Sequence, residues 1–507
     1  MSWLTNNFAP VFVAFAVSLM AWLYGGTRGE LLTATVPWMF LFMLEVVFCF
    51  PQRRAGESTH SARERAWRDM RRDPLVWTAV GFLALLMVPF VNNALCPLCD
   101  AEAIAAGHSA SPPIPFLPYS VDRIDHMNVV FWFAMSFSAM VAVKHSMNDA
   151  GKILTLKLIV WNGFALAVLG FVQTACGAPG PLWSDLLQRS GRVAGTFFST
   201  FGYPNMAGDY FTTLFAISLA LWRWSYDEVA AEIASDVDNA GRDRRGRFWR
   251  QHYFLIPAGL FFFAVLNTLS RASMLLVTAL TVVLFAHAGV VFLSRMHKVK
   301  RVKRGVWGAV AVGVLVFVAF NFTPEDVRTE IDTLNTEAVL DRVTGKGQYH
   351  TRVATEIWKE NMLFGCGGWG YLHYSPLKMA EGEKLQMVGG INVHNDYLQF
   401  LAEHGLAGLG AIVAIIVMLV WPIGKVWRRL VKIAQFSKSK NRPPSPVQIF
   451  AMPAGAFYIL AAAAATLVHG FGDCPLRSAA VMTLFFVMLA AAQGFMPDLD
   501  NQSNKEK

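Results

Sequence analysis

Long apolar runs follow one another along almost the whole chain, separated by polar segments. Most runs have close to 20 residues, which is the helical length that crosses about 30 Å of hydrocarbon. The pattern predicts an all-α, polytopic membrane protein with about twelve transmembrane helices. The expected spans are 8–24, 32–50, 74–91, 127–144, 153–175, 205–224, 253–269, 273–293, 306–322, 396–422, 449–468 and 478–495.

The spacing of these runs divides the chain into five parts. Residues 1–150 carry the N-terminal helices 1–4, and residues 151–322 carry helices 5–9. The segment 323–395 is a loop too long for a simple turn, and its charged, amphipathic stretches predict that it is mostly helical. Residues 396–495 carry helices 10–12, and 496–507 form a polar tail.

The positive charges predict the orientation of the chain in the membrane. Seven Lys and Arg residues lie in 51–73, six in 295–304 and seven in 425–442. The opposite loop 92–124 contains a single one, Arg123. Basic loops remain in the cytoplasm, so we expect both ends of the chain to be cytoplasmic and the long loop to be periplasmic.

The composition agrees with this assignment and excludes other classes. The chain is 54% hydrophobic with a mean hydropathy of +0.39, and only 16% of its residues are charged, against about 25% in soluble proteins. The net charge of +9 does not predict nucleic-acid binding, because the basic residues lie in loops between spans. The lipid bilayer is therefore an expected partner. No phosphate-binding loop and no HExxH motif occurs, so we expect no cofactor and no metal.

Five of the six cysteines fall on the predicted periplasmic side, where disulfides are permitted. The spacing leaves their pairing open, and one CxxC pair at 96–99 is too weak a signal for a metal or redox site. The five are Cys96, Cys99, Cys176, Cys366 and Cys474.

Ionisable residues gather where the spans meet the predicted periplasmic face. Because a charge inside the membrane is costly, this position indicates a functional site at the membrane surface. A transporter would instead be expected to have polar or broken spans near the midplane. The group comprises Arg192, Asp209, Arg271, Arg352, His394, Asp396, Glu403, His404, His469, Asp473 and Arg477.

Two stretches bring arginines to this face. "GRVAGTFFSTFGYPNMAGDY" contains Arg192 and starts span 6 at Pro204, where Asn205 is a candidate helix cap and the free N–H groups suit an anion. "LNTLSRASMLLV" joins spans 7 and 8 by a tight hairpin that carries Arg271. Each arginine alone could also simply extend to lipid headgroups.

A third stretch, "INVHNDYLQFLAEHGLAG" at 391–408, begins span 10 with unusually many ionisable groups. On a helix, Asp396, Gln399 and Glu403 share one face. The "HND" sequence also suits an ordinary helix start capped by Asn395 or Asp396. In the preceding loop, Arg352 could pair with Glu356 one turn later.

Two arginines and a histidine without a metal motif suit one kind of chemistry. Arginine binds phosphate through two parallel hydrogen bonds and stays charged, so two arginines can hold a diphosphate as it leaves. A histidine with a pKa near neutrality can take a proton from an attacking hydroxyl. We therefore infer glycosyl transfer from a lipid diphosphate.

The motifs "GTFFSTFGYPNMAG", "TLSRAS", "GCGGWGYLHY" and "HNDYLQFLAEHGLAG", in this order, resemble the O-antigen ligase and polymerase superfamily of bacterial envelopes. The resemblance covers about 150–495, and the His-Asn-x-Tyr-Leu motif at 394–398 is part of its most specific pattern. It implies a twelve-helix inner-membrane protein and a metal-independent, inverting transfer of glycan from undecaprenyl diphosphate. It also implies functional roles for Arg192, Arg271 and His394, with Arg189 as an alternative to Arg192.

These expectations give each candidate residue a role. Arg192 and Arg271 hold the diphosphate, His394 activates the acceptor hydroxyl, and Asp396 or Glu403 orients the histidine or contacts sugar. Trp369, in the Gly-rich turn 365–370, is expected at the mouth of the cavity because aromatic faces suit sugar rings. Further expected substrate contacts are Arg189, Arg352, Asn205, Asn395 and Tyr397.

The acceptor is left open by the sequence. Lipid A–core would make the protein an O-antigen ligase, which we favour. Another lipid-linked glycan would make it a polysaccharide polymerase, and a protein Ser or Thr would make it an O-oligosaccharyltransferase. A lipid-linked glycan transporter is a fourth alternative, against which the nearly charge-free spans argue.

Overall fold

The computed structural model describes residues 2–27, 30–94, 114, 116–182, 197–235, 244–294, 349–379, 392–436 and 452–497. Within these residues the chain is helical and has no β-strand; one isolated bridge pairs Phe198 with Phe201. The predicted all-α class is confirmed for the described part of the chain.

Eleven predicted spans coincide with described helices. These helices are α2 (Phe8–Trp22), α3 (Glu30–Cys49), α5 (Pro74–Ala94), α7 (Arg123–His145), α8 (Asp149–Ala175), α9 (Pro204–Ser235), α11 (Leu255–Asn267), α12 (Arg271–Ser294), α19 (Asp396–Phe436), α21 (Ala454–His469) and α22 (Ala479–Ala491). The remaining span, 306–322, lies outside the described residues, so the total of twelve stays a prediction.

Six of the described helices are long and apolar enough to cross a membrane: α3, α5, α7, α8, α12 and α19. Three shorter apolar segments accompany them, formed by α2, by α21, and by α22 with the turn η6 (Ala492–Phe495) that follows it. Length and composition therefore point to a membrane protein.

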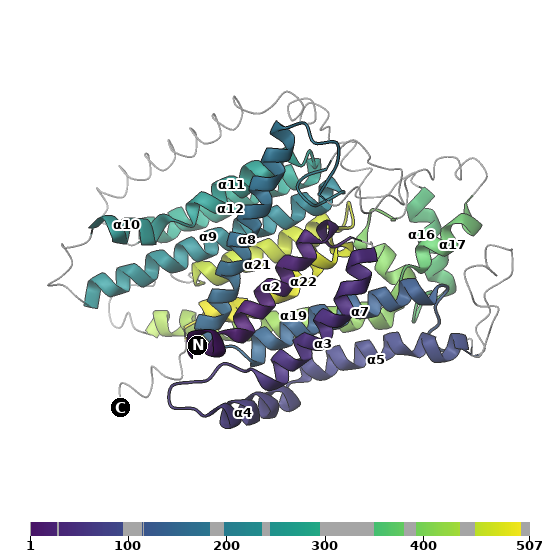
Figure 1. Cartoon of the computed structure of the whole chain (residues 1–507), viewed down its shortest axis with the longest axis horizontal. Helices are drawn as coiled ribbons and strands as arrows, with labels where there is room; N and C mark the ends of the chain where they lie inside the picture. Colours follow the sequence, from purple (N-terminus) through teal and green to yellow (C-terminus); the bar gives the residue numbers. More distant parts are fainter. Residues whose placement is uncertain are drawn as a thin grey trace.

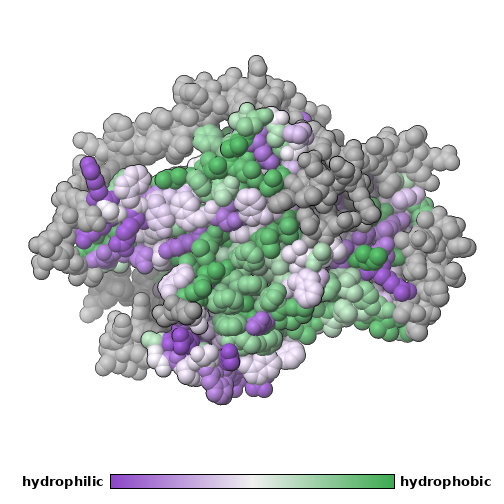
Figure 2. All heavy atoms as spheres, in the orientation of Figure 1, coloured by the Kyte–Doolittle hydropathy of each residue, from purple (hydrophilic) through white to green (hydrophobic). Residues whose placement is uncertain are grey.

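Four shorter helices pack at the edges of this apolar body. They are α4 (Thr59–Arg72), α10 (Arg244–His252), α16 (Tyr349–Glu360) and α17 (Gly370–Lys378). Figure 1 shows α16 and α17 at one end of the bundle. Figure 2 shows hydrophobic side chains across the middle of the same view and hydrophilic ones toward α4, α10 and α16. An apolar belt between polar ends is the surface that a bilayer requires.

Burial separates central helices from peripheral ones. All 13 residues of α22 are buried, and so is 89% of the apolar window of α7. The two helices are joined by a hydrogen bond of 2.8 Å between the hydroxyls of Ser136 and Thr483. By contrast, only 22% of the apolar window of α19 is buried, and side chains such as Trp421 face outward. The core therefore lies around α7 and α22, and α19 lies at its periphery.

Helix α19 is broken near its beginning. Gly405 has φ 62° and ψ −168°, a combination that is open essentially only to glycine. The segment 362–367, between α16 and α17, fills the break and exchanges four main-chain hydrogen bonds of 2.9–3.0 Å with residues 402–407. Gly365 allows the close approach, since a Cβ there would lie 2.2 Å from the carbonyl carbon of Glu403. The Gly-rich turn therefore anchors the α16–α17 segment to α19.

Replacing Gly405 by alanine is expected to lower the free energy of unfolding by at least about 2 kcal/mol, because the backbone angles are unfavourable for an L-residue. The added Cβ would also lie 2.3 Å from the main chain of Leu363. Thermal unfolding of the detergent-solubilised protein measures the change. Gly410→Ala is the matched control, since Gly410 lies in the same helix with open space beside it. Equal melting temperatures for the two variants would contradict the prediction.

Candidate active site

His394 lies two residues before α19 and has a left-handed backbone, with φ 56°. Its Nδ1 atom is 3.5 Å from Oδ1 of Asp473 and 3.3 Å from the hydroxyl of Tyr203. The side chain is 28% exposed, whereas that of Asp473 is 2% exposed. An Nδ1–H that faces the carboxylate leaves Nε2 with a lone pair, so His394 can accept a proton from a molecule bound beside it.

Asp473 is held by donors on several sides. The hydroxyl of Tyr203 lies 2.9 and 3.0 Å from its two oxygens, the amide of Asn205 donates to Oδ2, and the main-chain N–H of Cys474 donates to Oδ1 at 2.8 Å. Burial alone would raise the pKa of Asp473, but the hydrogen bond and charge of His394, with other donors and charges, lower it to about 2. Asp473 is therefore an anion at neutral pH, and one of its oxygens faces Nδ1 of His394.

The same network reaches the turn that carries Arg271. Oγ of Ser270 donates to Oδ1 of Asn205 at 2.5 Å and lies 2.8 Å from Oγ of Ser273. Leu269, just before, has a left-handed backbone with φ 57°, which turns the chain into α12. Arg271 is the first residue of α12. The structure therefore joins the arginine turn to the carboxylate that faces His394.

Three helices begin around Asp473. Asn205 is in the first turn of α9, Ser270 directly precedes α12, and the N–H of Asp396, the first residue of α19, donates to the carbonyl of Asp473 at 3.1 Å. A helix N-terminus presents free N–H groups and the positive end of the helix dipole. Such termini attract anions and phosphates in particular.

The predicted orienting carboxylates have other partners. Oδ2 of Asp396 accepts a hydrogen bond of 3.0 Å from the main-chain N–H of Leu476. Glu403 forms an ion pair of 2.5 Å with Arg477 and accepts a bond of 3.2 Å from Gln399. The carboxylate that contacts the ring of His394 is that of Asp473, whereas the sequence had suggested Asp396 or Glu403 for orienting the histidine or contacting sugar. The reason is that both predicted groups face the 470–477 turn.

Two other residues of the motif support the start of α19. Oδ1 of Asn395 accepts a bond of 3.0 Å from the N–H of Leu398, so Asn395 is the helix cap that the simpler interpretation expected. The hydroxyl of Tyr397 donates to the carbonyl of Leu467 at 2.6 Å, which ties α19 to α21. Asn205, also expected as a cap, is instead the second residue of its helix.

Two residues predicted to contact the substrate, Trp369 and Arg352, instead contact other side chains of the protein. The ring of Trp369 is 4% exposed, with the guanidinium of Arg477 5.1 Å from its centroid and Trp132 edge-on at 6.1 Å. Trp369 therefore packs in the interior and does not line the mouth of a cavity. Arg352 pairs with Glu356 at 2.9 Å on the exposed side of α16, which is the alternative that its spacing allowed.

Some predicted residues cannot be placed. Arg189 and Arg192 lie outside the described residues, as do Cys96 and Cys99. In the described part of the chain Cys176, Cys366 and Cys474 form no disulfide.

Sequence reasoning missed Tyr203 and the role of Asp473. Asp473 belonged to the group of ionisable residues at the predicted periplasmic face, but no pattern in the sequence paired it with His394. The only local signal for Tyr203 was its position beside Pro204 and Asn205, where a polar stretch begins a membrane helix.

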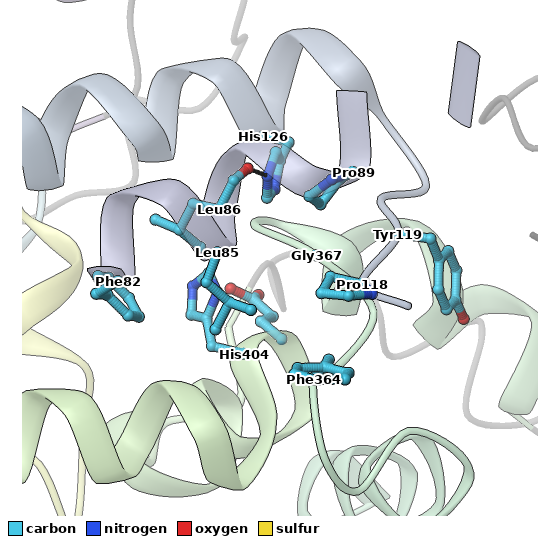
Figure 3. Close-up of a pocket in the computed structure, with 11 residues that line it drawn as sticks. Phe82, Leu85, Leu86, Pro89, Pro118, Tyr119, His126, Phe364, Gly367 and His404 are labelled. Atoms are coloured by element: carbon cyan, nitrogen blue, oxygen red, sulfur yellow. Dashed lines mark hydrogen bonds between the residues drawn. The ribbon is translucent and has the colours of Figure 1, made fainter. Parts of the chain in front are cut away.

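A separate small pocket is lined by residues of α5, α7, the 362–367 segment and α19 (Figure 3). Its lining is mostly apolar and contains four ionisable groups, Tyr119, His126, Glu403 and His404. Nε2 of His126 lies 2.7 Å from the carbonyl of Leu86, and its Nδ1 accepts a bond of 2.8 Å from the N–H of Gly368. Since His126 is bonded at both nitrogens and neither His394 nor Asp473 lines this pocket, we do not place the chemistry there.

The comparison with known families agrees with the sequence motifs. Residues 256–413 match a family model described as O-antigen ligase. The matched segment contains Arg271, α16, α17, the 362–367 turn, His394 and the break at Gly405. No curated protein matches the chain. This match supports the O-antigen ligase superfamily for the segment 256–413, in which the arginine turn and residues 394–398 lie.

Proposed function

We propose that this protein is a glycosyltransferase of the O-antigen ligase type. It moves a glycan from undecaprenyl diphosphate to a hydroxyl of lipid A–core, at the periplasmic face of the bacterial inner membrane. One observation carries the proposal: a single hydrogen-bond network links His394 and Asp473 to the turn of Arg271, where three helices begin. The match to the O-antigen ligase family supports the general class of reaction.

In the proposed reaction, Nε2 of His394 takes the proton of the acceptor hydroxyl. The acceptor oxygen attacks the anomeric carbon of the glycan, and the bond from that carbon to the diphosphate oxygen breaks. The configuration at the carbon is inverted. Asp473 stabilises the imidazolium that forms and keeps the ring in the tautomer that leaves Nε2 free.

The leaving diphosphate gains negative charge, which must be neutralised. Arg271 offers a planar, permanently charged group with paired donors, and the N-termini of α9, α12 and α19 add N–H groups. Arg192, or Arg189, is the proposed second cation. Two arginines and helix dipoles supply the positive charge that metal ions provide in many phosphate sites, so we propose that the transfer is independent of metal.

Transfer by the purified full-length protein tests this function. The protein is incubated with undecaprenyl-diphosphate glycan and, in separate reactions, with lipid A–core, a second lipid-linked glycan or a Ser/Thr peptide. Product on lipid A–core supports the ligase. Product on the other acceptors alone would assign a polymerase or a protein glycosyltransferase. Consumption of no donor with any acceptor would overturn the proposal.

Replacing Asp473 by asparagine is expected to lower kcat about 30-fold, or about 2 kcal/mol of activation free energy. The variant keeps the shape of the side chain but removes the charge that stabilises protonated His394. KM for the acceptor should change little, because Asp473 is buried behind the histidine. Steady-state kinetics with varied acceptor separates the two parameters.

Asp396→Asn is the matched control for that variant. Asp396 is also buried at the start of α19, and asparagine can still accept the hydrogen bond from Leu476. We expect kcat to stay within about threefold of wild type. An equal loss in both variants would mean that the region needs acidic residues in general and that Asp473 has no special relation to His394.

A further inference from the structure

The imidazole of His394 and the thiol of Cys474 both lie beside one carboxylate oxygen of Asp473. Nδ1 of His394 is 3.5 Å from Oδ1 of Asp473, and Sγ of Cys474 is 3.3 Å from the same oxygen. The ligand atoms of these residues all lie within 4.8 Å of one another. The thiol has no part in the proposed transfer, so the cluster offers more than that reaction uses.

An imidazole nitrogen, a carboxylate oxygen and a thiolate sulfur form a ligand set that suits Zn²⁺. Zinc takes these three ligand types at 2.0–2.3 Å, and three protein ligands with an open fourth position is a common arrangement. Cys474 and Asp473 are buried, whereas His394 is 28% exposed, so an ion can enter from the histidine side. The fourth ligand of the zinc ion, a water molecule, would also be on the side of His394.

A second cluster at the start of α7 serves as a comparison. Asp122, Asp125 and His373 also bring their ligand atoms within 4.8 Å, but without sulfur. Nε2 of His373 lies 3.1 Å from Asp125 and 3.8 Å from Asp122, which two ordinary ion pairs explain. The thiol is therefore the feature that distinguishes the His394 cluster.

We propose that His394, Asp473 and Cys474 form a binding site for Zn²⁺ and that the bound ion inhibits the protein. On binding, the thiol releases its proton to solvent and its sulfur forms a bond to zinc. The imidazole binds zinc through Nδ1, so its proton moves to Nε2. Nε2 then has no lone pair to accept a proton from the acceptor. Inhibition rests on the proposed function, whereas binding does not.

Cobalt serves as a spectroscopic probe of the site. Co²⁺ is titrated into metal-free, full-length protein in detergent, and a thiolate-to-cobalt charge-transfer band in the near ultraviolet is the expected signal. The band should disappear in Cys474→Ser and in Cys474→Ala, and it should weaken strongly in His394→Ala. The melting temperature of each variant, measured by thermal unfolding, establishes that the variant is folded.

Two control variants remove the other candidate ligands. His373→Ala eliminates the second cluster, and Cys96→Ser with Cys99→Ser eliminates the CxxC pair; both should keep the band. Absence of the band in the wild type, or its persistence in the Cys474 variants, would overturn the site. Zn²⁺ should displace the cobalt and abolish the band.

The inhibitory effect is measured as the ratio of transfer rates with and without Zn²⁺. The wild-type rate should fall at least about tenfold at saturating zinc and recover with a chelator, while Cys474→Ser should lose this sensitivity. Cobalt binding without inhibition by Zn²⁺ would overturn the inhibitory role alone. If the wild-type protein transfers no glycan to any acceptor, the proposed function fails. The cobalt titration still decides whether the metal site exists, because it does not depend on activity.

Discussion

Alanine in place of His394 is expected to reduce glycan transfer at least about 1,000-fold, because general-base catalysis contributes factors of about 10²–10⁴. The loss should appear in kcat, since the acceptor hydroxyl keeps its proton until late in the attack. Membrane insertion and thermal stability should be close to wild type, because the ring is partly exposed and its contacts with Tyr203 and Asp473 lie in the segments between helices. Initial rates with saturating donor and acceptor measure the effect.

His350→Ala is the control for this experiment. Its ring centroid lies 5.9 Å from that of His394, and Nδ1 of His350 bonds the hydroxyl of Tyr371 at 3.0 Å. Burial and the nearby charge of His394 lower the pKa of His350 to about 4, so this histidine is neutral at pH 7. We expect a loss below about tenfold. Full activity in His394→Ala, or an equal collapse in both variants, would contradict the assigned base.

The helical part of the fold could be predicted because its signal is local. An apolar run of about 20 residues needs no distant partner to identify it. The predicted starts at 205, 273 and 396 fall within two residues of the observed starts of α9, α12 and α19. Polar residues at these starts were also visible, since they interrupt the apolar pattern.

The break in α19 was not predictable from the same signal. "HGLAG" continues a helical pattern, and nothing in the sequence distinguishes Gly405, which has a positive φ, from Gly408 or Gly410. Those angles depend on the segment 362–367, some 40 residues away, which supplies the hydrogen bonds that the helix gives up. Neither stretch alone contains this information.

The orienting carboxylate was missed for a related reason. Asp396 and Glu403 are adjacent to His394 along the chain, and helix geometry made them the natural candidates. Asp473 lies 79 residues further on, in the turn before α22. Its proximity follows from the way α21 packs on α9, which local periodicity does not encode. The Glu403–Arg477 ion pair and the Asp396–Leu476 bond hold that turn in place.

Lysine in place of Arg271 is expected to lower kcat/KM about 100-fold, although the charge is conserved. Arginine makes two parallel hydrogen bonds to a phosphate, whereas lysine presents a single point charge on a flexible stem. Arg271→Ala should cost still more, about 1,000-fold, because the charge that balances the leaving diphosphate is lost as well. Rates with undecaprenyl-diphosphate glycan, measured at fixed salt, give both values.

Arg352→Lys is the matched control for this pair. Arg352 lies in the exposed ion pair with Glu356 on α16 and also donates to the carbonyl of Lys378 at 3.4 Å. Exposed ion pairs contribute about 0–1 kcal/mol, so this variant should transfer glycan within about threefold of wild type. If Arg271→Lys were fully active while Arg271→Ala was not, the arginine would act as a simple charge. If both were active, Arg271 would have no role at the diphosphate, and the helix N-termini would have to bind it with the arginine at 189 or 192.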